Sequence, residues 1–187
     1  IINNEAMIGS GIKAFWSTFN IINSEISYNR TISISDGGFG GAIYAESCFI
    51  TLINSTISNN MHAIHLGSSS IIFLNNLFYA NYKDYEDPNE WPDNMTATIS
   101  VVFGEESIFS NNTMVNNNGG IVHYYGNDRF FIQNSIFHNT SNNEGHSIIS
   151  YNISDSNSFE ISYSNYNEEE YYNVFATNDD GQGFDFS

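Results

Sequence analysis

A short asparagine-containing template repeats along the chain, and it restricts the possible fold more than any other feature. The template is Asn, then Ser or Asn, any residue, an apolar residue three places after the first Asn (+3), and Asn six places after it (+6). The stretch ITLINSTISNN (50–60) contains a complete copy anchored on Asn54. Further copies are anchored on Asn23, Asn75, Asn111 and Asn134. Self-similarity of this kind indicates a solenoid or a related repeat architecture.

Each unit of the repeat contains three short segments of β-type composition. One carries the anchor, one follows the +6 position, as in GGAIY (40–44), and one precedes the next anchor, as in SIIFL (70–74). With irregular copies at Asn3 and Tyr163, the anchors are separated by 20, 31, 21, 36, 23 and 29 residues, a base period of about 20 to 23 lengthened by insertions. Three strands in such a unit predict one coil of a parallel β-helix, in which successive coils stack about 4.8 Å apart.

The template also predicts which side chains fill the interior. The apolar +3 residues should form one stack, consisting of Ile26, Ile57, Phe78, Met114, Phe137 and Tyr166. Asn adopts the left-handed backbone conformation more readily than most residues, and its amide can bond an equivalent amide one coil away. We interpret the +6 Asn as a turn residue and the anchor Asn as a candidate for the amide ladder, and leave open which of the two stacks.

The histidines show no metal-ligand spacing. Aligning the GGAIY-type segments places Tyr44, His65, Ser100, His123 and Ile149 in one column. His65 and His123 would then lie two coils apart, which is too far for both to bind one metal ion. We expect them to be surface residues or members of a polar stack. Cys48 lies in the strand-like stretch ESCFITL, where a small core or edge residue is expected.

The segments GGAIY (40–44), ITLINSTISNN (50–60) and 134–168 resemble the right-handed parallel β-helix repeats of the pectin-lyase-like superfold. They are particularly similar to repeats of bacterial secreted and cell-surface proteins such as polymorphic outer-membrane proteins. The resemblance implies an all-β, right-handed parallel β-helix solenoid of about seven coils, with residues 1–187 in one domain. Because the repeat is already running at the first residue, we expect the sequence to be an excerpt of a longer chain. This superfold hosts lyases, hydrolases, adhesins and phage tailspikes, so the resemblance predicts a fold rather than a function.

The charge of the chain is strongly one-sided. Four Lys and Arg residues stand against 21 Asp and Glu residues, which gives a formal net charge of −17. Such a surface repels phosphate backbones and anionic lipids, so neither nucleic-acid binding nor electrostatic membrane docking is expected. No apolar stretch is long enough to span a membrane as a helix.

The clearest interruption of the repeat is an acidic and aromatic insertion, residues 82–95. Insertions in a solenoid leave the wall as loops, and loops on a rigid scaffold commonly carry binding sites. The insertion combines aromatic rings with carboxylates, a composition suited to a sugar or to Ca²⁺; a solvated cover over one face is the alternative. Its candidate ligand-binding residues are Tyr82, Asp84, Tyr85, Glu86, Asp87, Glu90, Trp91 and Asp93.

A second candidate cation site lies near the end of the sequence. In NDDGQG (178–183), Asp179 and Asp180 supply oxygen ligands beside a glycine turn, which suits Ca²⁺ but lacks the spacing of an EF-hand loop. No catalytic residues are assigned. The resemblance implies that a catalytic member would carry basic residues beside its Ca²⁺-binding acids, or a cluster of Asp with His, Arg and Lys. The four basic residues here are scattered.

The leading functional hypothesis is a non-catalytic, extracellular or cell-surface β-helix, either adhesin-like or a structural rod. Its expected partners are other coils at its ends, from its own chain or from other copies, and glycans. A carbohydrate-active enzyme (a polysaccharide lyase or glycoside hydrolase) or a glycan-binding module is the alternative. A receptor-binding protein similar to a phage tailspike is the third.

Overall fold

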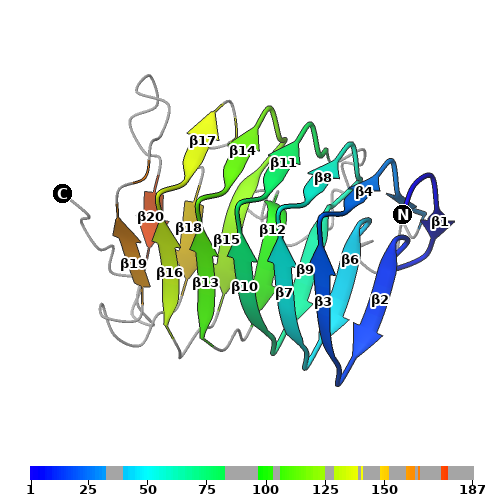
Figure 1. Cartoon of the computed structure of the whole chain (residues 1–187), viewed down its shortest axis with the longest axis horizontal. Helices are drawn as coiled ribbons and strands as arrows, with labels where there is room; N and C mark the ends of the chain where they lie inside the picture. Colours follow the sequence, from blue (N-terminus) through cyan, green and yellow to red (C-terminus); the bar gives the residue numbers. More distant parts are fainter. Residues whose placement is uncertain are drawn as a thin grey trace.

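The computed structural model of the chain is a parallel β-helix (Figure 1). It describes residues 1–32, 40–82, 97–102, 106–124, 129–138, 140, 148–151, 159–162, 164 and 174–176. Three sheets of seven, six and five described strands run along the solenoid, and neighbouring strands in each sheet come from successive coils. Every strand pair is parallel, so the predicted fold class is confirmed.

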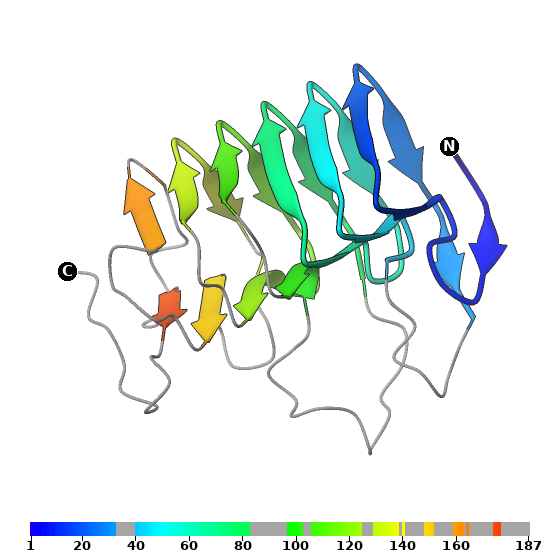
Figure 2. The ribbon, with the colours of Figure 1, turned by 90° about the horizontal axis from the view of Figure 1, so that it is seen from below.

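The strands alternate among the sheets in chain order (Figures 1 and 2). The first sheet contains β2 (Ile12–Phe15), β6 (Ile43–Glu46), β9 (Ile64–Gly67), β12 (Ala97–Val102), β15 (Gly120–Tyr124), β18 (Ile148–Tyr151) and β20 (Val174–Ala176). The second sheet contains β3 (Thr18–Ile22), β7 (Phe49–Ile53), β10 (Ser70–Leu74), β13 (Ser107–Ser110), β16 (Phe130–Gln133) and β19 (Phe159–Ser162). The third sheet contains β4 (Glu25–Ser27), β8 (Thr56–Ser58), β11 (Leu77–Tyr79), β14 (Thr113–Val115) and β17 (Ile136–His138). A short pair, β1 (Glu5–Ala6) and β5 (Arg30–Thr31), follows the third sheet in the first two coils.

The interior stack predicted from the +3 positions is confirmed. The strand registers pair Ile26 with Ile57, Ile57 with Phe78, Phe78 with Met114 and Met114 with Phe137. All five side chains are buried. Tyr166 lies outside the described residues. Side chains alternate between the interior and the surface along the strands of the walls. In β7, for example, the side chains of Ile50 and Leu52 are fully buried whereas that of Phe49 is exposed.

Phenylalanine side chains fill the interior of the middle coils. Phe73 and Phe109 come from the second sheet, whereas Phe78 and Phe137 come from the third, and their rings contact across the interior with centroids 5.8 to 6.4 Å apart. These distances are typical of favourable aromatic pairs. The aromatic contacts therefore join two walls of the solenoid as well as successive coils.

The asparagine roles are the reverse of our interpretation. The anchors Asn23, Asn54, Asn75, Asn111 and Asn134 have φ between 46° and 57° and are turn residues. The +6 residues are buried and form the ladder: the Nδ2 of Asn29 donates to the Oδ1 of Asn60, Asn60 donates likewise to Asn81, and Asn81 to Asn117, at 2.9 to 3.1 Å. The ladder ends on Thr140. It is favoured at this position because a buried amide there also reaches a backbone carbonyl of the neighbouring coil.

A second ladder follows the anchors, at the position after each one. Asn76 donates from Nδ2 to the Oδ1 of Asn112 at 2.9 Å, and the position is filled by Ser55 in the preceding coil and Ser135 in the following one. The pair Asn3 and Asn4, which we aligned with the anchors, belongs instead to the +6 ladder. Asn4 donates to Asn29 at 2.9 Å, and Asn3 is the left-handed residue before it.

The histidine column is also wrong by one residue. β12 and β15 shift register between Ala97 and Ile99, so Ser100 pairs with Val122 rather than with His123. The backbone of His123 aligns with Val101, in the column that contains Ala45 and Leu66. The rest of the column is as predicted, since Tyr44 pairs with His65 and His65 with Ser100.

Candidate functional site

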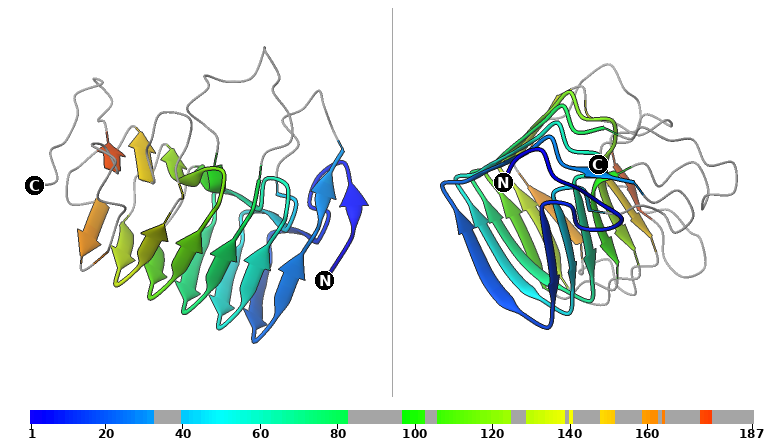
Figure 3. Two further views of the ribbon diagram at one scale, coloured as in Figure 1. Left: turned by 90° about the horizontal axis from the view of Figure 1, so that it is seen from above. Right: turned by 90° about the vertical axis from the view of Figure 1, so that its right-hand side faces the viewer.

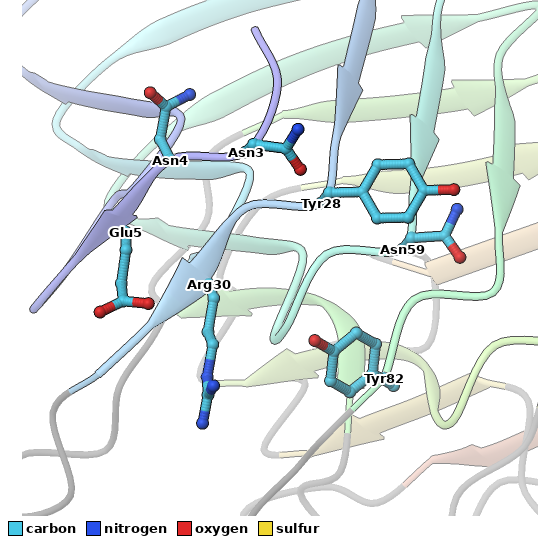
Figure 4. Close-up of a pocket in the computed structure, with 7 residues that line it drawn as sticks. All are labelled: Asn3, Asn4, Glu5, Tyr28, Arg30, Asn59 and Tyr82. Atoms are coloured by element: carbon cyan, nitrogen blue, oxygen red, sulfur yellow. The ribbon is translucent and has the colours of Figure 1, made fainter.

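An open groove lies where the chain leaves the third sheet in the first three coils (Figure 4). Its volume is about 500 Å³. The lining residues are Asn3, Asn4, Glu5, Tyr28, Arg30, Asn59 and Tyr82. The groove therefore combines two phenol rings, three amides, one carboxylate and one guanidinium group.

Three of the lining residues occupy one structural position in successive coils. Asn3, Tyr28 and Asn59 each precede a residue of the +6 ladder and have φ of 59°, 56° and 54°. Each backbone N–H donates to a carbonyl one coil further on, that of Ser27, Ser58 or Tyr79, at 3.1 to 3.2 Å. The ladder beneath them fixes this backbone, so the side chains project from a rigid corner.

Tyr28 is unusual at this position. A bulky residue with positive φ is an outlier, because the left-handed conformation costs a non-Gly residue about 1 kcal/mol or more. The same position holds Asn59, Ala80 and Asn116 in later coils. The Tyr28 side chain is 57% exposed, so packing does not compensate for the strained backbone. Outliers of this kind point to a functional role.

Tyr82 faces the groove from the coil wall rather than from a loop. Its backbone pairs with Met61, its N–H donates to Asn60 at 3.0 Å, and its carbonyl accepts from His62 at 2.9 Å. Its side chain is 37% exposed. Figure 4 shows Tyr28 and Tyr82 lining the groove from different segments of the chain, with Asn59 between them in that view. Tyr82, the first residue of the predicted insertion 82–95, therefore belongs to the coil wall.

Glu5 and Arg30 supply the charges of the groove. They stand opposite each other in the register of β1 and β5. Among the described residues that line the groove, Glu5 supplies the carboxylate and Arg30 the guanidinium group.

The other sequence-predicted ligand residues lie outside the described part of the chain. These are Asp84, Tyr85, Glu86, Asp87, Glu90, Trp91 and Asp93, together with Asp179 and Asp180. Within the described ranges, no three His, Cys, Asp or Glu residues come together in a group able to hold a metal ion. Of the predicted residues, the structure places Tyr82 at the groove and leaves the remainder as predictions.

A second polar cluster covers the outer face of the first sheet. The Tyr44 hydroxyl donates to Glu46, and the Tyr44 ring stacks on His65 with centroids 5.3 Å apart. Burial, followed by the bond to Glu46, raises the pKa of Tyr44 to about 12. Burial lowers the pKa of His65 to about 4, so its imidazole is neutral at pH 7. The Lys13 ammonium lies 5.8 Å from the Tyr44 ring centroid. This cluster is a packed network on the surface of the first sheet.

No protein-family model, curated protein or solved structure matches this chain. The described part of the chain contains no helix that is long and apolar enough to cross a membrane.

Tyr82 is one of the predicted ligand-binding residues and lines the groove, whereas the sequence did not single out the other lining residues Tyr28, Glu5 and Arg30. The template recorded only the positions +1, +3 and +6, whereas Tyr28 is at +5, where Asn59 and Asn116 stand in other coils. An aromatic residue among turn-forming residues was the available signal. Glu5 and Arg30 carry no local signal, because only the pairing of β1 with β5 brings them together.

Proposed function

We propose that this protein is a non-catalytic β-helix of the cell surface or extracellular space, which binds glycans in the groove between Tyr28 and Tyr82. The observation that carries the proposal is Tyr28, an exposed aromatic residue held in a strained backbone at the edge of a polar groove. The ladders and the phenylalanine core supply the rigid, adhesin-like scaffold.

The chemistry of the groove fits a sugar ring. Exposed aromatic faces pack against the C–H faces of sugars, while the amides of Asn3 and Asn59 and the guanidinium group of Arg30 provide hydrogen-bonding partners for hydroxyls. A rigid site binds with a smaller loss of conformational entropy than a mobile one. The acidic insertion starts next to Tyr82, and its carboxylates and Trp91 are proposed to extend the same site.

The test is a glycan-binding panel, measured with and without Ca²⁺, on the wild-type chain and two variants. Tyr28→Asn installs the turn residue of the neighbouring coils, so binding should weaken about tenfold while the free energy of unfolding rises by about 1 kcal/mol. Ala80→Asn is the matched control, because it makes the same relief of strain outside the groove and should leave binding unchanged.

Two outcomes would contradict the proposal. If the Tyr28→Asn variant bound glycans as tightly as the wild type, the groove would not be the glycan-binding site. Turnover of a glycan that disappears when acids in 84–93 are replaced would favour the enzymatic alternative.

A further inference from the structure

The outer face of the second sheet is apolar over the middle coils, where β7, β10, β13 and β16 lie side by side (Figures 1 and 3). In β10, Ile71 and Phe73 are buried in the interior, whereas Ile72 and Leu74 are partly exposed on the opposite face. The strand registers place further outward apolar residues beside these two. We call the resulting patch the outer stripe; it consists of Ile53, Ile72, Leu74, Ile108 and Phe131.

A strand that is apolar on both faces is typical of a sheet that is covered on both sides. The run 71–74 in β10 has this character, because four consecutive residues are Ile, Ile, Phe and Leu. A contiguous apolar patch on the surface of a soluble protein commonly marks an interaction site. The outer stripe therefore points to a second layer packed over this wall of the solenoid.

The charges of the described residues allow another copy to approach this face. The outward positions of β7, β10, β13 and β16 hold no charged residue. Glu106 and Arg129 immediately precede β13 and β16 and have opposite signs. The acidic insertion 82–95 connects β11 of the third sheet to β12 of the first, so the chain enters and leaves it from the other two walls. Two copies can thus meet through uncharged surfaces despite a net charge of −17 on each.

The shape and size of the face also suit an identical sheet. Sheets that pack face to face lie about 10 Å apart with matching twists, and two identical sheets satisfy this condition. The six strands have four or five residues each, so with spacings of about 4.8 Å between strands and 3.3 Å per residue the face measures roughly 29 by 16 Å. Two such faces bury about 900 Å² in total, an area typical of weak, transient complexes. The expected dimer therefore forms as the protein concentration rises.

We propose that two copies of this chain associate through the outer faces of their second sheets, with their outer stripes in contact about a two-fold axis. One stripe serves both copies, as a symmetric interface requires. Thr51, Ser110 and Gln133 border the stripe and supply the polar rim of the interface. An anionic lipid surface fits less well, because the net charge of the chain repels it. None of the stripe residues lines the groove, so this inference does not depend on the glycan-binding proposal.

The test places a charge in the middle of the outer stripe. The Ile72→Lys dimer should dissociate at least about tenfold more readily than the wild type, because burying an unpaired charge is costly. Leu77→Lys is the matched control, since it adds the same charge in place of an outward apolar residue on the third sheet and should leave association unchanged. Sedimentation velocity over a range of concentrations measures the association. Far-UV circular dichroism should be the same for both variants and the wild type, because both substitutions are on outer faces of the solenoid.

Thiol labelling locates the contact independently of an added charge. The Ile108→Cys variant carries a thiol in the outer stripe and the Leu77→Cys variant carries one on the third sheet, whereas the native Cys48 is buried. The rate at which a maleimide labels Ile108→Cys should fall as the protein concentration rises. The rate for Leu77→Cys should stay constant.

Several results would overturn the dimer. They are a wild-type chain that stays monomeric at every concentration tested, association of Ile72→Lys as tight as that of the wild type, or weakened association of Leu77→Lys. A labelling rate of Ile108→Cys that does not depend on protein concentration would also overturn it. Protection of that thiol in a monomeric chain by phosphatidylcholine vesicles would assign the face to lipid instead of a second copy.

Discussion

At the scale of single residues, each corner of the solenoid uses a pair of residues with separate tasks. The first is left-handed and turns the chain, and the second is buried and donates its N–H to the side-chain oxygen of its counterpart in the next coil. Ser47–Cys48, Asn54–Ser55 and Asn59–Asn60 are the three pairs of one coil. The abundance of Asn-Asn and Asn-Ser therefore follows from corner geometry, since Asn suits both tasks and Ser suits the buried one.

The ladder residue Asn60 should contribute more to stability than its neighbour Asn59. Asn60→Ala leaves two buried donors of Asn29 without their acceptor and the carbonyl of Ile26 without its donor. Each unsatisfied buried group costs about 1 to 3 kcal/mol, so a total loss of about 3 kcal/mol or more is expected. Asn59→Ala changes only a turn residue and should cost about 1 kcal/mol. Urea unfolding of both variants measures the difference; equal losses would argue against a structural role for the ladder.

The imidazole of His65, which packs against the Tyr44 ring on the outer face of the first sheet, should make stability depend on pH. Its pKa is about 4 in the folded chain, below the ordinary value of 6.5, because burial disfavours the charged form. Between these values the unfolded chain binds a proton that the folded chain does not, so the free energy of unfolding should fall as the pH falls from 6.5 to 4. His65→Phe retains a ring beside Tyr44 and should have a shallower slope over this range. Identical slopes in urea titrations of the two proteins would refute this role.

At the scale of strands, the core depends on contacts between walls. Phe109 of β13 packs against Phe73, Phe78 and Phe137, two of which belong to the third sheet. Phe109→Ala should lower the free energy of unfolding by about 3 to 5 kcal/mol through lost burial and a residual cavity. Phe109→Leu, which retains most of the volume, should lose less. If denaturant unfolding gave the same loss of unfolding free energy for both variants, the proposed contribution of buried volume at Phe109 would be wrong.

The strands were predictable from the sequence to the extent that they follow a simple period. The alternation of apolar residues and the +3 stack identified the interior correctly, because burial of alternate side chains is what a strand requires. The register of β15 was not predictable, because the irregularity between Ala97 and Ile99 changes one alignment by a single residue without altering composition. The asparagine roles were exchanged for a related reason: both positions hold Asn, and only the backbone distinguishes them.

The groove was predictable only in part. Tyr82 is among the predicted ligand-binding residues because it is the first residue of the insertion 82–95, which departs from the template. Tyr28 and Arg30 meet Glu5 and Asn3 through contacts between coils that are about 25 residues apart in the sequence. Such contacts become visible once the coil register is known, which the sequence alone does not fix.

At the scale of the whole molecule, electrostatic repulsion opposes the compact fold. A net charge of −17 in 187 residues should lower stability at low ionic strength. The thermal midpoint should therefore rise by several degrees between about 0.01 and 0.2 M NaCl, as the screening length falls from about 30 Å to less than 10 Å. A further rise with Ca²⁺ at matched ionic strength would support a cation site such as Asp179 and Asp180. A midpoint that falls with salt would contradict the repulsion argument.

The ladders also give the solenoid a direction, with consequences for how such a chain can change in length. Every coil offers side-chain oxygens to the coil before it and N–H groups to the coil after it, as in the series Asn29, Asn60 and Asn81. Removal of residues 54–74, one coil, would join Ile53 to Asn75. The coils brought together would present to each other the same kinds of hydrogen-bond donors and acceptors as before. Duplication of the same unit would match equally well. Coil number in this architecture is consequently open to gain and loss by unequal recombination, and the groove keeps its lining residues when the unit gained or lost lies beyond Tyr82.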